Sequence, residues 1–84
     1  MPLKFSDYAW ADYLYWQTTD KQMLKRINAL IKECQRTPFE GTGKPEPLKH
    51  QLAGFWSRRI DQTHRLVYAV EGDVLEIAQC RDHY

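Results

Sequence analysis

The last third of the chain contains three short strand-like runs separated by turn signals, and this pattern limits the folds open to it. The runs cover residues 55–60, 64–70 and 74–80, and the polar segments 61–63 and 71–73 lie between them. Short runs with Gly and Asp in the gaps are typical of consecutive antiparallel strands. We therefore expect a β-meander in this part of the chain.

A short strand at residues 3–5 and two helices should precede the meander. Ser6 is placed to cap the first helix, with Asp7 in its first turn, and we expect this helix to run to about Gln17. The spacing of its large side chains predicts that one stripe packs into the core. The stripe consists of Trp10, Tyr13, Leu14 and Gln17.

The second helix should begin at a capping box and end before a proline. Thr19 and Gln22 have capping-box spacing, and Thr37-Pro38 stops the helical pattern after Arg36. A strand, a helix pair and a meander in this order predict one α+β domain over residues 1–84, with the helices on one face of the sheet. Apolar residues recur at helical spacing along the second helix at Met23, Leu24, Ile27, Leu30, Ile31 and Cys34.

Positive charge is concentrated in one part of the sequence. The formal net charge is +1, so the chain as a whole is not drawn to nucleic acid. Arginines on a helix-covered face are costly to bury without partners, so we expect the uncovered face of the sheet to be the cationic one. Between residues 44 and 65 there are two acids against five basic residues, Lys44, Lys49, Arg58, Arg59 and Arg65.

Several functional classes find no support in the sequence. Cys34 and Cys80 have neither CxxC spacing nor a His/Cys cluster around them, so neither a zinc site nor a redox motif is indicated. No cofactor-binding motif is present. The N-terminus turns polar too early for a signal peptide, and no run approaches membrane-spanning length. We expect a cytoplasmic chain that uses no metal or cofactor.

Two segments outside the helices can carry chemistry. Residues 37–54 form a long Gly- and Pro-rich connection, a kind of segment that is often functional. Within it, Pro45 and Pro47 hold the backbone of Glu46 extended and so restrict where its carboxylate can lie. His83 and Tyr84 follow the last strand-like run, and they offer an imidazole that can donate a proton and a phenol that can stack on a base.

An acid, a base and a guanidinium together are suited to cutting RNA without a metal. Glu46 would accept the proton of a 2′-hydroxyl that attacks the neighbouring phosphate. Arg65 would stabilise the negative charge that develops on the phosphate oxygens. His83 would protonate the leaving 5′ oxygen.

Other residues would support this chemistry. Lys49 and Arg59 would bind the same or neighbouring phosphates, and Tyr84 would stack on a base to align the attack. His50 and His64 are rival general acids, and a structural role is open for each of them.

Three motifs carry a resemblance to a known family. They are GKPEPLKH, GFWSRRI and HRLVYAV, in this order, together with YLYWQTTDK near the start and His-Tyr after the last strand. In these motifs the chain resembles YoeB-type toxins, which belong to the RelE superfamily of bacterial toxin–antitoxin systems. The resemblance covers essentially the whole chain.

The resemblance implies a microbial-ribonuclease-like fold and cleavage of messenger RNA in the decoding site of a translating ribosome. It also implies an antitoxin partner of the YefM type and allows a homodimer. Thr63 is a departure, because relatives can have an acid there, and this puts an orienting role for an acid at that position in doubt. The family's base, phosphate-binding and acid positions are matched by Glu46, Lys49, Arg59, Arg65, His83 and Tyr84.

Two other interpretations use the basic patch without catalysis. A non-catalytic RNA- or ribosome-binding module would keep the cations but would need neither Glu46 nor His83. A protein-interaction domain would bind an acidic partner through the same patch. The joint presence of a restrained carboxylate and an imidazole favours the enzyme.

Overall fold

The elements follow the order that the sequence predicts, with an additional short strand and a 3₁₀ helix in the long connection. The computed structural model describes residues 1–83. Its elements are β1 (Leu3–Phe5), α1 (Asp7–Thr19), α2 (Lys21–Arg36), β2 (Glu46–Pro47), the 3₁₀ helix η1 (His50–Leu52), β3 (Trp56–Arg59), β4 (Arg65–Glu71) and β5 (Val74–Gln79).

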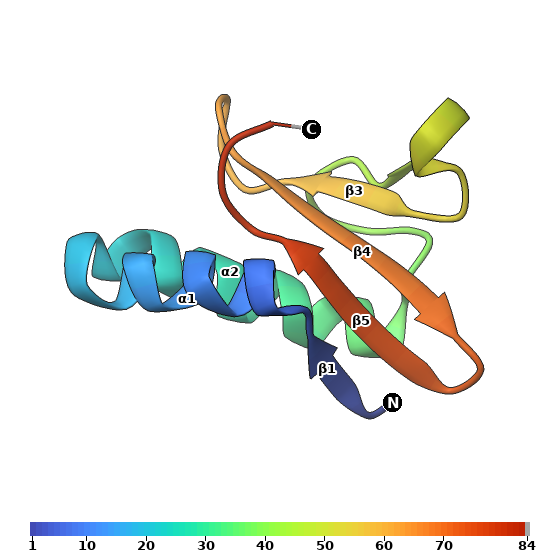
Figure 1. Ribbon diagram of the computed structural model, residues 1–84, viewed down its shortest axis with the longest axis horizontal. Coiled ribbons are helices and arrows are strands. Elements are labelled where there is room, and N and C mark those ends of the chain that lie inside the picture. Colours follow the sequence, from blue (N-terminus) through green and yellow to red (C-terminus); the bar gives the residue numbers. More distant parts are fainter. Residues whose placement is uncertain (84) are drawn as a thin grey trace.

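The strands form one mixed sheet in the order β1-β5-β4-β3-β2. The meander is confirmed, since β3 pairs antiparallel with β4 and β4 pairs antiparallel with β5. β1 extends the sheet by pairing parallel to β5, and β2 pairs antiparallel to β3 at the other edge. In Figure 1 the two helices lie side by side on one side of the sheet, which confirms the α+β prediction.

The core lies between the helices and the sheet. The predicted stripe of α2 is confirmed, because Met23, Ile27, Leu30, Ile31 and Cys34 are buried. Leu24 is half-buried and packs against this core. Facing them from the sheet are the buried side chains of Leu66, Tyr68, Leu75 and Ile77.

The predicted stripe of α1 is wrong. Trp10 and Leu14 are 48% and 42% exposed, whereas Ala9, Asp12 and Trp16 are buried. Because α1 carries aromatic residues around most of its circumference, helical spacing fits more than one stripe, and the stripe that packs inward contains a carboxylate. Of the predicted set, Tyr13 is half-buried and packs against the core cluster.

The predicted capping box at Thr19 is also wrong. Thr19 is the last residue of α1, and Asp20 caps both helices. The Oδ1 atom of Asp20 accepts hydrogen bonds from the backbone N–H groups of Gln22 (3.0 Å) and Met23 (3.3 Å). An aspartate at this position satisfies the free N–H groups of the first turn without a partner side chain at Gln22. The cap at Ser6 is confirmed, since its Oγ accepts from the N–H of Ala9.

Arg58 is not part of the basic patch, contrary to the sequence-based expectation. Its side chain is fully buried on the helix-covered side of the sheet, where it forms a 2.6 Å ion pair with Glu33 of α2. Its Nε donates to the Tyr68 hydroxyl over 3.2 Å. Burial is tolerable here because the charge is paired and its donors are satisfied.

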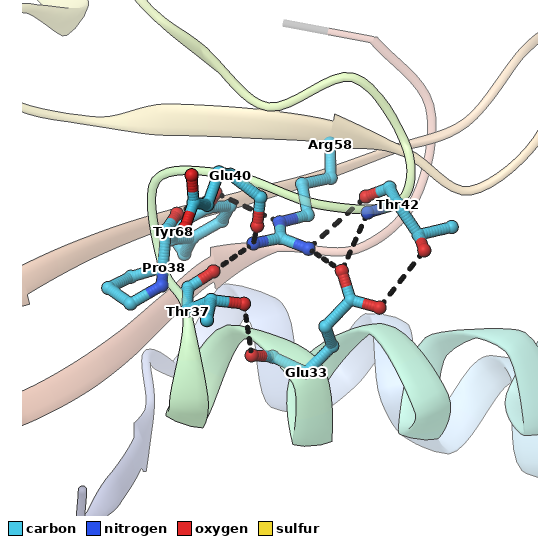
Figure 2. A network of polar contacts seen from close by, with 7 residues as sticks. All are labelled: Glu33, Thr37, Pro38, Glu40, Thr42, Arg58 and Tyr68. Carbon is cyan, nitrogen blue, oxygen red and sulfur yellow. Dashed lines mark hydrogen bonds and ion pairs between the residues drawn. The ribbon is translucent and has the colours of Figure 1, made fainter.

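The Arg58 guanidinium also organises the connection that follows α2 (Figure 2). It donates to the backbone carbonyls of Thr37, Glu40 and Thr42. Glu33 accepts from both the backbone N–H and the hydroxyl of Thr42. The connection is therefore not structureless: a buried cation fixes its first half, and β2 and η1 order the second half.

Gly41 lies where this network leaves no room for a side chain. Its φ is +121°, and a Cβ atom there would lie 2.1 Å from Oε2 of Glu33. Real Cβ atoms do not come this close, so the Glu33–Arg58 pair requires glycine at this position. The network thereby fixes the segment that leads into β2 and Glu46.

Candidate active site

The sheet face opposite the helices carries three of the predicted site residues. In the sheet register, Glu46 lies opposite Ser57, and Ser57 lies opposite Val67. Arg59 lies opposite Arg65. Residues directly opposite each other share a face, as do alternate residues of one strand. Glu46, Arg59 and Arg65 therefore project from the same face.

The register also sets the separation of these groups. β3 lies between Glu46 on β2 and Arg65 on β4, and the two residues are offset by two positions along the strands. With neighbouring strands about 4.8 Å apart and about 3.3 Å per residue, their Cα atoms are roughly 12 Å apart. Long side chains on the two strands can approach one another across this distance.

The turn that precedes β4 orients the side chain of Arg65. Its Nη1 donates to the carbonyls of Asp61 (2.8 Å) and His64 (3.1 Å). Within residues 1–83, the hydrogen bonds of the Arg65 side chain all leave from Nη1. The remaining guanidinium donors lie at the start of β4 and can serve an anion.

The carboxylate of Asp61 holds the turn rather than pairing with Arg65. It accepts from the backbone N–H groups of Thr63 (2.8 Å) and His64 (2.7 Å). Partial burial raises the pKa of Asp61, but these two hydrogen bonds and nearby positive charge together hold the pKa below its ordinary value. Thr63 itself is exposed in this turn.

The segment that follows β5 is anchored to α1. The backbone N–H of Cys80 donates to Oδ2 of Asp12 over 3.1 Å. Its carbonyl accepts from Nε1 of Trp16 over 2.8 Å. Both donors and acceptors are buried, so residue 80 is fixed against the helix. These two anchors are functional candidates that the sequence analysis missed. The four-residue spacing of Asp12 and Trp16 puts them on one helix face but gives no sign of a partner at residue 80.

The same segment then crosses to the start of β4. The carbonyl of Asp82 accepts from the backbone N–H of Arg65 over 2.9 Å. The N–H of Asp82 donates to Nδ1 of His64 over 2.7 Å. His83 is the next residue and is exposed. In Figure 1 the chain after β5 turns toward the loop between β3 and β4. His83 thus follows directly on the residue that pairs with the backbone of Arg65. The predicted Tyr84 lies outside the described residues.

Lys49 lies farther from this group. The chain continues from β2 past Leu48, whose N–H donates to the carbonyl of Phe55, so it runs away from Arg59. Lys49 is exposed and precedes η1, in which His50 is also exposed. The structure thus brings Glu46, Arg59 and Arg65 to one face. It places His83 next to the residue that pairs with Arg65, and Lys49 farther away.

Strained backbone accompanies the candidate residues. Within residues 1–83, the non-glycine residues with positive φ are Lys44 (53°), His50 (58°) and Asp82 (63°). Each lies within two residues of Glu46, Lys49 or His83. Such conformations persist where the surrounding structure holds them, and they are concentrated at functional sites.

The two thiols are unsuited to nucleophilic chemistry. Cys34 and Cys80 are free and buried. Burial raises the pKa of both, and that of Cys80 to about 12, so neither forms a thiolate near neutral pH. Among residues 1–83 no three His, Cys, Asp or Glu side chains come together as a metal ion would require. None of the described helices is long and apolar enough to cross a membrane.

Comparison with known proteins identifies the family. The family model of the YoeB-like toxins of bacterial type II toxin–antitoxin systems matches residues 5–84. The chain is 67% identical to the toxin YoeB of Escherichia coli K12 over 84 residues, which is all of both chains. It belongs to the YoeB-like toxins. The chain is therefore the toxin component of a type II toxin–antitoxin system.

Solved structures of other YoeB-like toxins share the fold. A YoeB/ParE toxin from Agrobacterium tumefaciens is 53% identical, with a TM-score of 0.97 and full coverage of both chains. The Staphylococcus aureus toxin in its heterotetrameric YoeB–YefM complex is 48% identical, with a TM-score of 0.92, covering 100% of this chain and 98% of that one. The S. aureus YoeB has also been solved as a dimer.

Proposed function

We propose that this YoeB-like toxin is a metal-independent endoribonuclease that cleaves messenger RNA in the A site of the ribosome and so inhibits translation in the cytoplasm. The observation that supports this proposal is that a carboxylate and two arginines share one sheet face, while the segment that leads to an imidazole pairs with the start of β4. Glu46, Arg59 and Arg65 share that face by register, and the hydrogen bond between Arg65 and Asp82 holds the residue that precedes His83.

The proposed reaction is an internal displacement at phosphorus. Glu46 accepts the proton of the 2′-hydroxyl while the 2′ oxygen forms a bond to the adjacent phosphorus. The bond from phosphorus to the 5′ oxygen breaks, and His83 gives that oxygen a proton. The products are a 2′,3′-cyclic phosphate and a 5′-hydroxyl end. Glu46 then loses its extra proton to water and His83 takes one up, which returns both residues to their starting states.

The cationic residues supply the electrostatic part of the reaction. The guanidinium of Arg65 is held by its Nη1 and presents its other donors to the phosphate oxygens as negative charge develops. Arg59, directly opposite, contributes a second cation to the same phosphate or its neighbour. Lys49 contacts the backbone farther along the strand, and Tyr84 stacks on a base.

We further propose that a YefM-type antitoxin neutralises this chain. The S. aureus relative was crystallised with YefM. An acidic segment that folds on binding can wrap a target this small and cover the cationic face or displace residues 80–83. The S. aureus YoeB was also solved as a dimer, which supports a homodimer of this chain. The support for both associations comes from the relatives' structures rather than from the site.

The test is expression of the chain in bacteria without an antitoxin. The proposal expects growth arrest, with messenger RNA cut inside open reading frames, and rescue when a YefM-type antitoxin is co-expressed. Glu46→Gln should abolish cutting, because the amide cannot accept the proton. Glu40→Gln is the matched control, since Glu40 is an exposed glutamate of the same connection that contributes its backbone carbonyl. Arrested cells with intact messenger RNA would instead identify a ribosome-binding blocker.

A further inference from the structure

The imidazole of His64 lies between α1 and the segment that leads to His83. Its ring packs edge-on against Trp16, with centroids 4.8 Å apart and an interplanar angle of 83°. Its side chain is 18% exposed. On the other side, its Nδ1 atom lies 2.7 Å from the backbone nitrogen of Asp82. The acid–base set proposed above gives His64 no task.

The polarity of this contact fixes the state of the ring. A backbone N–H can only donate, so Nδ1 of His64 must accept through its lone pair. The contact therefore requires the tautomer that leaves Nδ1 free to accept and has the hydrogen on Nε2. A ring in this state, with Nδ1 occupied and one edge against Trp16, is placed to hold the chain rather than to protonate a leaving group.

Two successive residues at the start of β4 therefore hold the peptide groups of one residue. His64 accepts from the N–H of Asp82, and Arg65 donates its own N–H to the Asp82 carbonyl. Between these two contacts Asp82 adopts a φ of +63°, in the left-handed region that non-glycine residues rarely occupy. The direction in which the chain enters His83 depends on that conformation.

We propose that His64 is a positioning residue whose Nδ1 lone pair holds the Asp82 backbone and thereby places the His83 imidazole beside Arg65. This inference rests on the proposed function, in which His83 is the general acid. The chain rotates about Asp82 when the contact is lost, and His83 is the adjacent residue. A displacement of about 1 Å at a reacting group can lower a rate by about a hundredfold.

Two substitutions test the hydrogen-bond acceptor of His64 and its ring separately. His64→Phe keeps a flat ring for the packing against Trp16 but has no acceptor. His64→Asn loses the ring but places its Oδ1 two bonds from Cβ, where Nδ1 stands in histidine. The inference expects His64→Phe to cut messenger RNA on the ribosome about a hundredfold more slowly than wild type. It expects His64→Asn to stay within about threefold of wild type.

A change of leaving group shows whether the lost rate belongs to the general acid. The wild-type cleavage position is mapped first, and a message is then prepared with sulfur in place of the 5′ bridging oxygen at that position. A thiolate leaves without a proton, so a misplaced acid no longer matters. His64→Phe should cut the sulfur substrate at nearly the wild-type rate. An equal defect on both substrates would overturn the inference, as would a wild-type rate for His64→Phe on the oxygen substrate.

Hydrogen exchange at the Asp82 amide provides a readout that does not depend on activity. The amide should be protected in wild type and in His64→Asn and should exchange rapidly in His64→Phe. Equal protection in all three would overturn the anchoring role. If His64→Phe does not fold, the test relies on His64→Asn. A folded His64→Asn that no longer cuts messenger RNA would then overturn the inference. If the wild-type chain cuts no message at all, the proposed function fails, while the exchange measurement still tests the His64–Asp82 contact.

Discussion

The carboxylate of Asp12 on α1 accepts a hydrogen bond from the backbone N–H of Cys80, which joins two residues 68 positions apart in the sequence. The bond is buried, and it fixes the point at which the chain leaves β5 for the candidate site. The oxygen of Asp12 stabilises the contact by accepting this hydrogen bond. Its negative charge is destabilised, because burial removes the water that would hydrate it. The charge of Asp12 and its acceptor role can therefore be tested separately.

The variants Asp12→Asn and Asp12→Ala make that separation. Asparagine keeps an oxygen acceptor without a charge, so Asp12→Asn should be at least as stable as wild type at pH 7. Asp12→Ala leaves the Cys80 N–H buried without a partner and should lower the free energy of unfolding by about 1–3 kcal/mol. Chemical denaturation of the three proteins measures this. A large loss of stability in Asp12→Asn would show that the negative charge itself is required.

The pH dependence of the same pair has a definite sign. Burial raises the pKa of Asp12 above its ordinary 3.8, despite the opposing bond from Cys80 and the charge of Arg81. The folded chain thus binds this proton more tightly than the unfolded chain. As the pH falls from the folded pKa toward 3.8, wild type should gain stability relative to Asp12→Asn. If the difference in unfolding free energy between wild type and Asp12→Asn does not change across this pH range, the raised pKa of Asp12 is contradicted.

Arg58 should prove to be a structural residue with an indirect effect on function. Arg58→Met fills similar volume but removes a buried cation that five acceptors share, and it should cost about 3 kcal/mol of unfolding free energy. Arg59→Met, the next residue and exposed, is the matched control and should leave stability within about 0.5 kcal/mol of wild type. Equal melting temperatures for the two variants would contradict the buried network.

The thiols should be inert in the folded chain. Cys34 and Cys80 are buried and their pKa values are raised, so an alkylating reagent at pH 8 should modify neither in native protein and both after denaturation. Mass spectrometry of intact protein before and after denaturation gives the count. Rapid modification of Cys80 in native protein would mean that the segment after β5 opens far more readily than its anchors suggest.

Much of the fold could be predicted from the sequence, because in most elements the local sequence pattern agrees with the side chains that are buried. The stripe of α2 and the three runs of the meander each have a single pattern that satisfies both. α1 lacks this agreement, since its aromatic side chains fit several faces and the inward one includes Asp12. The partner of Asp12 lies at Cys80, and local spacing carries no information about a contact across the whole chain.

The candidate site shows the same division. The sequence was enough to predict a cationic face away from the helices, but the register of β3 with β4 and of β2 with β3 was needed to bring Arg59, Arg65 and Glu46 together on it. Arg58 was counted in the basic patch, because the sequence does not show that Glu33 and three backbone carbonyls are placed to bind it on the helix-covered face. The role of His64 depends on a backbone group of Asp82, which side-chain identity cannot predict.

Removal of residues 83–84 should separate stability from activity. The anchored residues Cys80 and Asp82 remain in place, so unfolding free energy should fall by no more than about 1 kcal/mol. Cleavage should fall about a hundredfold to ten-thousandfold, as for loss of a general acid. Thermal melting, ribosome binding and single-turnover cleavage make the comparison. A truncated chain that binds and still cuts at the wild-type rate would place the acid elsewhere, with His50 as the next candidate.

The most direct test of the proposed chemistry is the structure of the RNA ends. Purified toxin is mixed with ribosomes that carry a defined message, and the fragments are examined by mass spectrometry. Attack by the 2′-hydroxyl predicts a 2′,3′-cyclic phosphate, or its 3′-phosphate product, upstream of the cut and a 5′-hydroxyl downstream, and Glu46→Gln should yield neither. Fragments with a 5′-phosphate would show that water or a metal-bound hydroxide attacks instead, and the account of Glu46, Arg65 and His83 as one acid–base set would be wrong.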